Sequence, residues 1–209
     1  MEAVKSGSDY DLVDPSTHKV TGQLNAAEVF NKIVENAWKT GEPGIIFLDR
    51  LNRDNVVPEY GEIESTNPCG EQLLPYESCN LGSINLVAML DETEDGSFQI
   101  NYDRLSATVD KAVHFLDNVI EVNKYPLDAI DHTTKQIRKI GLGIMGFADM
   151  LLYLGVAYNS EEGVALGEKI MAFINDRAKR KSQELAKTRG SFPLFNSSTL
   201  KDGQPTRNG

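Results

Sequence analysis

A polar segment precedes an apolar run in two adjoining stretches, Glu62-Ile-Glu-Ser-Thr-Asn-Pro-Cys-Gly-Glu-Gln72 and Leu73-Leu-Pro-Tyr-Glu-Ser-Cys-Asn-Leu-Gly-Ser-Ile-Asn-Leu86. Residues 62–77 show neither the helical nor the strand period, because two prolines and a glycine interrupt them. The run from Leu81 to Leu90 is compatible with a strand or with the start of a helix. The pattern predicts a loop mounted on a regular, buried element.

Three different chemical groups stand at alternate positions of this loop. Asn67 supplies a carboxamide, Cys69 a thiol and Glu71 a carboxylate, which together offer a hydrogen-bonding group, a hydrogen-atom or electron carrier and a proton acceptor. Gly70 would let a ligand approach the backbone closely. Cys79 follows near enough to reach the same pocket. These residues indicate either a catalytic pocket or, as the plainer alternative, a structural cysteine packed as a small hydrophobe.

The flanking sequence is typical of an α/β chain. Gly44-Ile-Ile-Phe-Leu48 predicts a strand buried on both faces, whose end leads into the polar loop 49–55. Residues 1–23 are predicted to be irregular, with a hairpin turn near residues 14–17, and a second turn is predicted at residues 94–96. Helices are predicted from Asn25 to about residue 40, from Asp103 to Val122, from about Leu127, over Gly141–Gly155, and from Ser160 to about Arg189.

Composition narrows the possible functions. The formal net charge is -10, the wrong sign for a surface that follows nucleic-acid phosphates, so binding to a nucleic-acid polymer is not expected. No apolar run is long enough to cross a bilayer, and we expect a cytoplasmic chain without a membrane partner. The two cysteines are too few for a disulfide scaffold, lack the paired spacing of structural zinc sites, and give no reason to expect a metal site.

Longer strings of the sequence resemble a known family. Asn67-Pro-Cys-Gly-Glu71 followed by Cys79-Asn-Leu-Gly-Ser-Ile-Asn-Leu86 closely resembles the active-site finger loop of ribonucleotide reductases, most of all the adenosylcobalamin-dependent class II enzymes. The resemblance continues through Pro43–Asp54, Phe115–Ile120 and Ile140–Asp149. It therefore extends over nearly the whole chain.

The resemblance implies a role for each residue of the finger loop. Cys69 would hold a transient thiyl radical that abstracts the ribose 3′ hydrogen, and Glu71 would take the proton of the 3′ hydroxyl. Asn67 would bind the substrate hydroxyls. Cys79 would be one of two reducing cysteines, the other of which belongs upstream in the family, where this sequence has none.

Two further residues are weaker candidates for substrate binding. Ser78 adjoins the reducing cysteine, and Arg50 follows the predicted strand, where it could meet a phosphate. For Arg50 and its neighbour Arg53, an ion pair with Asp49, Asp54 or Glu59 is the alternative reading.

The resemblance also implies a fold and an activity. Residues 1–209 would form a single partial catalytic-barrel domain, part of a ten-stranded α/β barrel with the finger loop at about 62–80 and outer helices. The activity would be that of a ribonucleoside-diphosphate or triphosphate reductase. It would use adenosylcobalamin bound mainly outside this segment and a dithiol reductant such as thioredoxin.

Its partners would be the ribonucleotide, the remaining segments of the reductase and, when complete, a second copy in a homodimer. Two alternatives stay open: a truncated or split piece without activity of its own, or a simple dithiol redox module that uses Cys69 and Cys79.

Gly141-Leu-Gly-Ile-Met-Gly146 fits the glycine spacing of a dinucleotide-binding loop. The preceding residues look helical rather than strand-like, so this motif is interpreted instead as helix packing through small residues.

Overall fold

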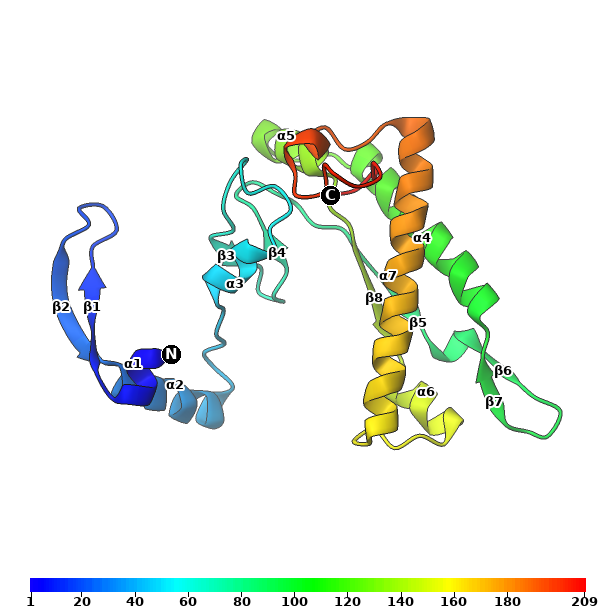
Figure 1. The fold of residues 1–209 in the computed structure, drawn as a ribbon, viewed down its shortest axis with the longest axis horizontal. Coiled ribbons are helices and arrows are strands. Elements are labelled where there is room, and N and C mark those ends of the chain that lie inside the picture. Colours follow the sequence, from blue (N-terminus) through cyan, green and yellow to red (C-terminus); the bar gives the residue numbers. More distant parts are fainter. The chain divides into compact units, whose positions relative to one another are not determined.

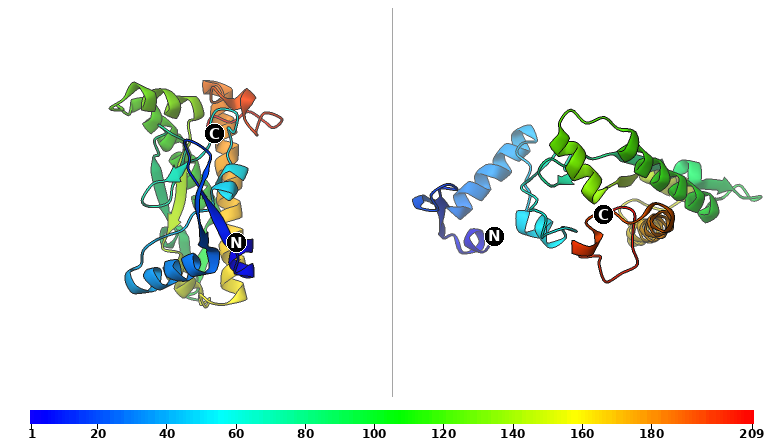
Figure 2. Two further views of the ribbon diagram at one scale, coloured as in Figure 1. Left: turned by 90° about the vertical axis from the view of Figure 1, so that its left-hand side faces the viewer. Right: turned by 90° about the horizontal axis from the view of Figure 1, so that it is seen from above.

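A computed structural model describes residues 1–209 and divides into two compact units, Met1–Phe47 and Leu48–Gly209 (Figures 1 and 2). That residues 1–209 belong to a single barrel domain stays a prediction. No helix combines the length and the apolar character that crossing a membrane requires.

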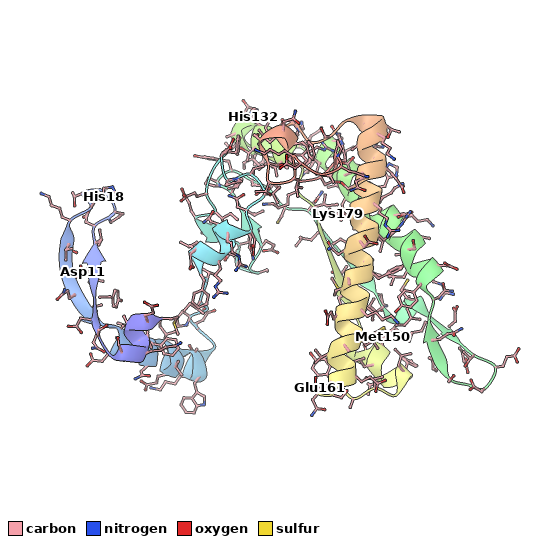
Figure 3. The ribbon with its side chains drawn as sticks, in the orientation of Figure 1. Asp11, His18, His132, Met150, Glu161 and Lys179 are labelled. Carbon is pink, nitrogen blue, oxygen red and sulfur yellow. The ribbon has the colours of Figure 1, made fainter.

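The first unit is a β-hairpin followed by a helix. The segment that was expected to be irregular contains helix α1 (Glu2–Ser6) and strands β1 (Asp9–Val13) and β2 (Val20–Asn25). That prediction is therefore wrong. The two strands are regular because they pair with each other, and the polar sequence does not reveal this pairing. The predicted turn is confirmed. Asp14 Oδ1 accepts hydrogen bonds from the backbone N–H groups of Ser16 and Thr17, and His18 lies at the tip (Figure 3).

Helix α2 (Ala26–Thr40) begins where the sequence predicts. The Asn25 side chain accepts hydrogen bonds from the N–H groups of Ala27 and Glu28 and so caps the helix. The apolar stripe of α2 is only partly covered within this unit, since the Trp38 side chain is 82% exposed.

The predicted buried strand at residues 44–48 is wrong. Ile45, Ile46 and Phe47 are exposed and lie in irregular backbone. Helix α3 (Leu48–Arg53) then replaces the predicted polar loop, with an acidic residue in its first turn and arginines in its last, the order that the helix dipole favours. An apolar run forms a strand only when another strand pairs with it, and none does so here.

A parallel pair of strands organises the second unit. Strand β5 (Leu81–Asn85) pairs with β8 (Gly141–Met145), with Leu81 opposite Gly141 and Asn85 opposite Met145. The prediction of a helix over Gly141–Gly155 is therefore wrong in its first third. Glycine has low helix propensity, and β5 offers the strand partner that the local sequence could not reveal.

Helix α6 (Phe147–Leu154) begins directly after β8, with Gly146 as its N-cap. The glycines of the dinucleotide-like motif thus lie in a strand and at a helix cap. The interpretation of that motif as helix packing is wrong, because residues Gly141–Met145 form a strand that pairs with β5. Without a loop between strand and helix, the motif does not form a phosphate-binding turn.

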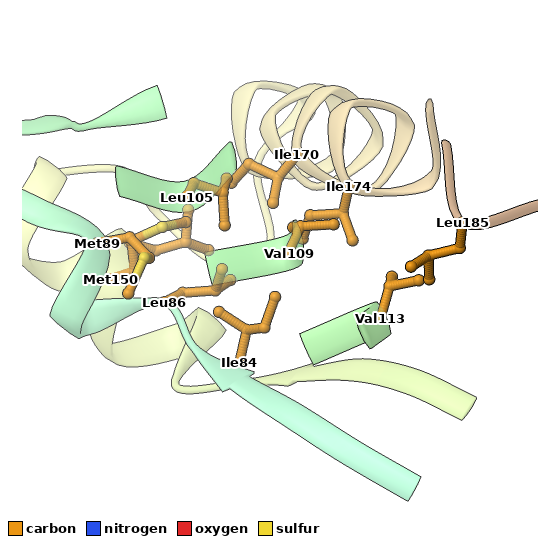
Figure 4. Close-up of a cluster of buried hydrophobic side chains, with 11 residues drawn as sticks. Ile84, Leu86, Met89, Leu105, Val109, Val113, Met150, Ile170, Ile174 and Leu185 are labelled. Atoms are coloured by element: carbon orange, nitrogen blue, oxygen red, sulfur yellow. The ribbon is translucent and has the colours of Figure 1, made fainter. Parts of the chain in front are cut away.

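Two long helices cover one face of the strand pair. Helices α4 (Tyr102–Val122) and α7 (Glu161–Arg189) pack against each other, and α4 also packs on β5 and β8. Their shared core is apolar and includes Ile84, Leu86, Leu105, Val109, Val113, Met150, Ile170 and Ile174 (Figure 4). Leu81 and Met145, on the strand pair, are exposed. The predicted helices over 103–122 and 160–189 are confirmed, the latter with Ser160 as its cap.

The remaining elements are short. Leu86 leads into a 3-10 turn, η1 (Val87–Met89), and then into the hairpin of β6 (Leu90–Glu92) and β7 (Phe98–Ile100), which confirms the turn at 94–96. Helix α5 (Asp128–Ile137) also appears as predicted. A second core joins residues near 57–74 to α5 and to the 3-10 turn η2 (Phe195–Ser197).

The expectation of an α/β fold is confirmed as a mixed α/β arrangement, while the barrel is not seen. The strands form four separate two-stranded sheets, and none of these closes into a barrel. A ten-stranded barrel needs more strands than this chain contributes.

Candidate functional site

The candidate finger loop is a short hairpin rather than an irregular loop. Strands β3 (Ser65–Thr66) and β4 (Gln72–Leu73) pair antiparallel, with Thr66 opposite Gln72. The Asn67 N–H donates to the Glu71 carbonyl oxygen at 3.1 Å, and the Gly70 N–H donates to the Asn67 carbonyl oxygen at 2.9 Å. Gly70 has a φ of 94°, which explains why glycine suits this turn. The hairpin therefore presents residues 67–71 at its tip.

Cys79 lies beside this tip, although twelve residues separate it from Asn67 in the chain. The Asn67 Nδ2 group donates a hydrogen bond to the Cys79 sulfur at 3.4 Å. Both cysteines are free thiols; Cys69 is exposed at the tip, and Cys79 is half-buried. The structure thus brings Asn67 and Cys79 into contact.

A cavity of about 390 Å³ opens between the hairpin and the start of the strand pair. Gly70, Glu71, Cys79 and Lys139 are among the residues that line it. The Oε2 atom of Glu71 is buried and makes no hydrogen bond. Glu71 and Cys79 therefore line one small pocket, large enough for part of a small-molecule substrate.

The backbone on both sides of Cys79 is held by polar contacts from the helices. The Ser78 N–H donates to Thr134 Oγ1 at 3.0 Å, and Thr134 is buried in α5. The Asn80 side chain donates to the Leu116 carbonyl oxygen at 2.8 Å, while the Asn80 carbonyl oxygen accepts from the Gly141 N–H at 3.0 Å. Cys79 is thus mounted between α4, α5 and the first residue of β8.

Sequence reasoning missed a second pair of residues at this pocket. Lys139 Nζ lies 2.7 Å from Glu77 Oε2, and the side chain of Glu77 is fully buried. The two residues are 62 positions apart, and no spacing in the sequence pairs them. Only the position of Glu77, two residues before Cys79, could have drawn attention to Glu77 in the sequence.

Neither of the two weaker candidates, Ser78 and Arg50, lines the cavity. Ser78 is half-buried, and its backbone is engaged by α5. Arg50 is exposed on α3. Its neighbour Arg53 forms an ion pair with Asp54 at 2.8 Å, which confirms the ion-pair reading for that arginine. Substrate contacts of Ser78 and Arg50 stay predictions.

A buried charge cluster fixes the helices behind the site. The Asp117 carboxylate is fully buried and accepts hydrogen bonds from Arg138, Arg189 and Asn208. Burial by itself raises the pKa of Asp117. This effect is outweighed by the hydrogen bond and charge of Arg138, the charge of Arg207 and the hydrogen bond of Arg189. The pKa of Asp117 therefore lies below its usual value. Asp117 is therefore an anchoring anion.

Comparison with known proteins gives a consistent result. A family described as "Ribonucleotide reductase, barrel domain" matches residues 1–208. The chain is 53% identical over 203 residues to a vitamin B12-dependent ribonucleoside-diphosphate reductase of Thermoplasma acidophilum, a match that covers 96% of this chain and 26% of that protein. It is 46% identical over 209 residues to the protein of the same description from Mycobacterium tuberculosis (strain H37Rv), covering 100% of this chain and 29% of the relative.

A more distant relative is the ribonucleoside-diphosphate reductase subunit alpha of Chlamydia trachomatis serovar D, 34% identical over 191 residues, with 89% of this chain and 18% of that protein covered. The chain spans between 26% and 29% of the length of the two more similar relatives.

Proposed function

Since the chain belongs to the barrel-domain family of ribonucleotide reductases, we propose that it contributes the finger loop of an enzyme that reduces ribonucleotides to 2′-deoxyribonucleotides. The observation that carries this proposal is the hydrogen bond to the Cys79 sulfur from Asn67, at the tip of the hairpin that also carries Cys69 and Glu71. Glu71 and Cys79 line the cavity, whereas Cys69 does not. The relatives at 53% and 46% identity are named as diphosphate reductases, which favours ribonucleoside diphosphates as substrates.

The chemistry that we propose needs a hydrogen-atom carrier, a base and a reductant. A thiyl radical on Cys69 would take the hydrogen atom from C3′ of the ribose and return it at the end, so that Cys69 is regenerated. Glu71 would accept the 3′ hydroxyl proton, and the 2′ hydroxyl would depart as water after taking up a proton from a thiol of the reducing pair.

Overall, one dithiol would be oxidised to a disulfide for each deoxyribonucleotide and each water formed. Cys79 would supply one thiol of that pair, and the second would come from a cysteine outside this sequence. The Cys69 thiol is exposed at the hairpin tip, as a group that must meet both a radical source and a substrate requires.

Adenosylcobalamin is the proposed cofactor of the whole protein, because the two more similar relatives are named as vitamin B12-dependent. The cavity of about 390 Å³ beside Glu71 and Cys79 is far too small for a corrin ring. This cavity therefore does not hold that cofactor, and we propose that the cofactor binds mainly outside this segment. A thioredoxin-like dithiol and a second copy of the complete subunit are the proposed partners.

The chain spans about a quarter of its relatives' length, so we propose that it turns over substrate only together with the remaining segments. The test is a turnover assay with adenosylcobalamin, a ribonucleoside diphosphate and dithiothreitol, run on the chain alone and with those segments supplied. Deoxynucleotide is expected only in the second case.

Three variants in that complemented assay separate the proposed roles. Cys69→Ser is expected to abolish turnover, and Glu71→Gln is expected to lower it by about 10²–10⁴-fold through loss of the base. Glu64→Gln removes an exposed carboxylate from the same loop and is the matched control, with turnover unchanged. Turnover that survives Cys69→Ser would contradict the radical role and favour a simple dithiol module.

A further inference from the structure

Lys139 connects the two cysteine-bearing segments of the site. We propose that it is a positioning residue, which holds the segment before Cys79 against the hairpin that carries Cys69. The importance of this role for catalysis rests on the proposed function, whereas the role of Lys139 in holding the two segments together does not.

The contacts of the Lys139 ammonium group reach both segments at once. Nζ donates to Glu77 Oε2 at 2.7 Å and to the Gln72 carbonyl oxygen at 3.1 Å. Gln72 belongs to β4 and follows Glu71 directly, and Glu77 lies two residues before Cys79. One side chain therefore sets the separation between the hairpin arm and the Cys79 segment.

Glu77 makes this contact more than a surface ion pair. Its side chain is fully buried, its Oε2 atom also accepts the Leu74 N–H at 2.9 Å, and its Oε1 atom is buried without a partner. Lys139 is the one cation that the structure places on this carboxylate. Removing one partner of such a pair leaves an uncompensated charge away from water, which is far more costly than losing an exposed pair.

Lys139 itself is held on a rigid base. It follows Arg138, the residue that ends α5 in a left-handed conformation and whose guanidinium lies 2.7 Å from Asp117 Oδ1. It precedes β8 by two residues, and β8 is paired along its length with β5. The ammonium group is thus carried by the same framework that fixes Ser78 and Asn80, and it adds the link to the hairpin that those two residues lack.

The geometry leads to a specific expectation for Cys79. Without Lys139, residues 72–77 lose a polar link to the framework and the neutralisation of Glu77, while Leu74 keeps its place in the second core and Ser78 stays bonded to Thr134. The Asn67–Cys79 hydrogen bond, which depends on the hairpin staying in place, should then open. The Cys79 thiol should become more accessible, whereas the Cys69 thiol is exposed already.

In the experiment, the whole folded chain is treated with iodoacetamide and then digested. Mass spectrometry of the peptides gives the rate of alkylation of each cysteine. The readout is the ratio of the Cys79 rate to the Cys69 rate, in which changes common to the molecule cancel. Lys139→Met is expected to raise this ratio about tenfold, and Lys139→Arg, which keeps the charge and the donors, is expected to hold it within about threefold of the parent.

A neighbouring lysine provides the matched control. Lys135 lies on α5, four residues before Lys139, and pairs with Asp131 at 2.6 Å, but both side chains are substantially exposed. Lys135→Met should leave the ratio unchanged. A ratio for Lys139→Met within about twofold of the parent overturns the proposal, since the opening would then be negligible.

A second variant covers the case in which Lys139→Met does not fold. The double variant Lys139→Met with Glu77→Gln removes the buried charge together with its partner, and still lacks the link to Gln72. It is expected to raise the ratio about tenfold as well, and an unchanged ratio in this folded variant overturns the proposal. Because alkylation needs neither nucleotide nor cofactor, its result is independent of the Cys69→Ser turnover assay that tests the reductase function.

Discussion

Replacing Asp117 by Asn tests whether the buried charge cluster stabilises the second unit. The change keeps the size of the side chain but removes the charge that Arg138 and Arg189 contact at 2.7 and 3.0 Å. With the remaining amide oxygen in the place of Oδ1, which accepts from Asn208 at 3.1 Å, the amide nitrogen in the place of Oδ2 can no longer accept from Arg189. The Arg138 side chain, only 4% exposed, would keep a single carboxylate partner, Glu121, at 2.6 Å.

The size of the effect follows from burial. Breaking a buried ion pair by removing one partner costs about 3–5 kcal/mol. Glu121 continues to neutralise part of the arginine charge, so we expect Asp117→Asn to lower the free energy of unfolding by about 3 kcal/mol, the lower end of that range. An exposed pair on α7, Asp176 with Arg180, serves as the control, and Asp176→Asn should cost less than about 0.5 kcal/mol.

The difference in the free energy of unfolding between the parent and Asp117→Asn should decrease at low pH. The pKa of Asp117 is lowered in the folded protein, so its charged form contributes stability above the unfolded pKa of about 3.9, and that contribution disappears as the pH falls through the folded value. The difference between parent and Asp117→Asn should therefore be constant above about pH 5 and shrink below about pH 4.

Urea denaturation followed by far-ultraviolet circular dichroism is the appropriate assay, because the long helices α4 and α7 dominate that signal. An Asp117→Asn variant within about 1 kcal/mol of the parent at neutral pH, or a difference that grows as the pH falls, would refute the reasoning.

Three other perturbations test single features of the fold. Asn25→Ala removes the cap of α2 and should cost about 1 kcal/mol, read from amide hydrogen exchange within α2, and unchanged protection of those amides would rule out the cap. Gly146→Ala forces a φ of 72° on alanine and brings its Cβ to 2.9 Å from Asn85 Oδ1, so we expect a loss of at least about 1–2 kcal/mol by circular dichroism, with a neutral result contradicting the geometry. The pKa of Asp95 is lowered to about 2 by hydrogen bonds within its turn, and carbon NMR should find its midpoint there rather than near 3.8.

The candidate site shows what local sequence can and cannot predict. The order of Asn67, Cys69 and Glu71 is read from the chain itself, and it was enough to mark the loop. The Lys139–Glu77 pair was not predictable, because its partners are 62 residues apart and meet only once α5 and β8 have packed. The nearness of Cys79 to this loop was predicted from its position in the chain, whereas its hydrogen bond with Asn67 depends on the hairpin.

Features that depend on neighbouring residues alone were determined by the sequence. The caps at Asn25 and Ser160, the turns at 14–17 and 94–96 and the amphipathic helices α4 and α7 all arise from contacts within a few positions. The parallel pair of β5 and β8 was decided by tertiary structure, because each strand exists only through hydrogen bonds to a partner that is distant in the chain. Gly141–Met145 found such a partner in β5 and became a strand against expectation, while the apolar run at 44–48 found none and did not.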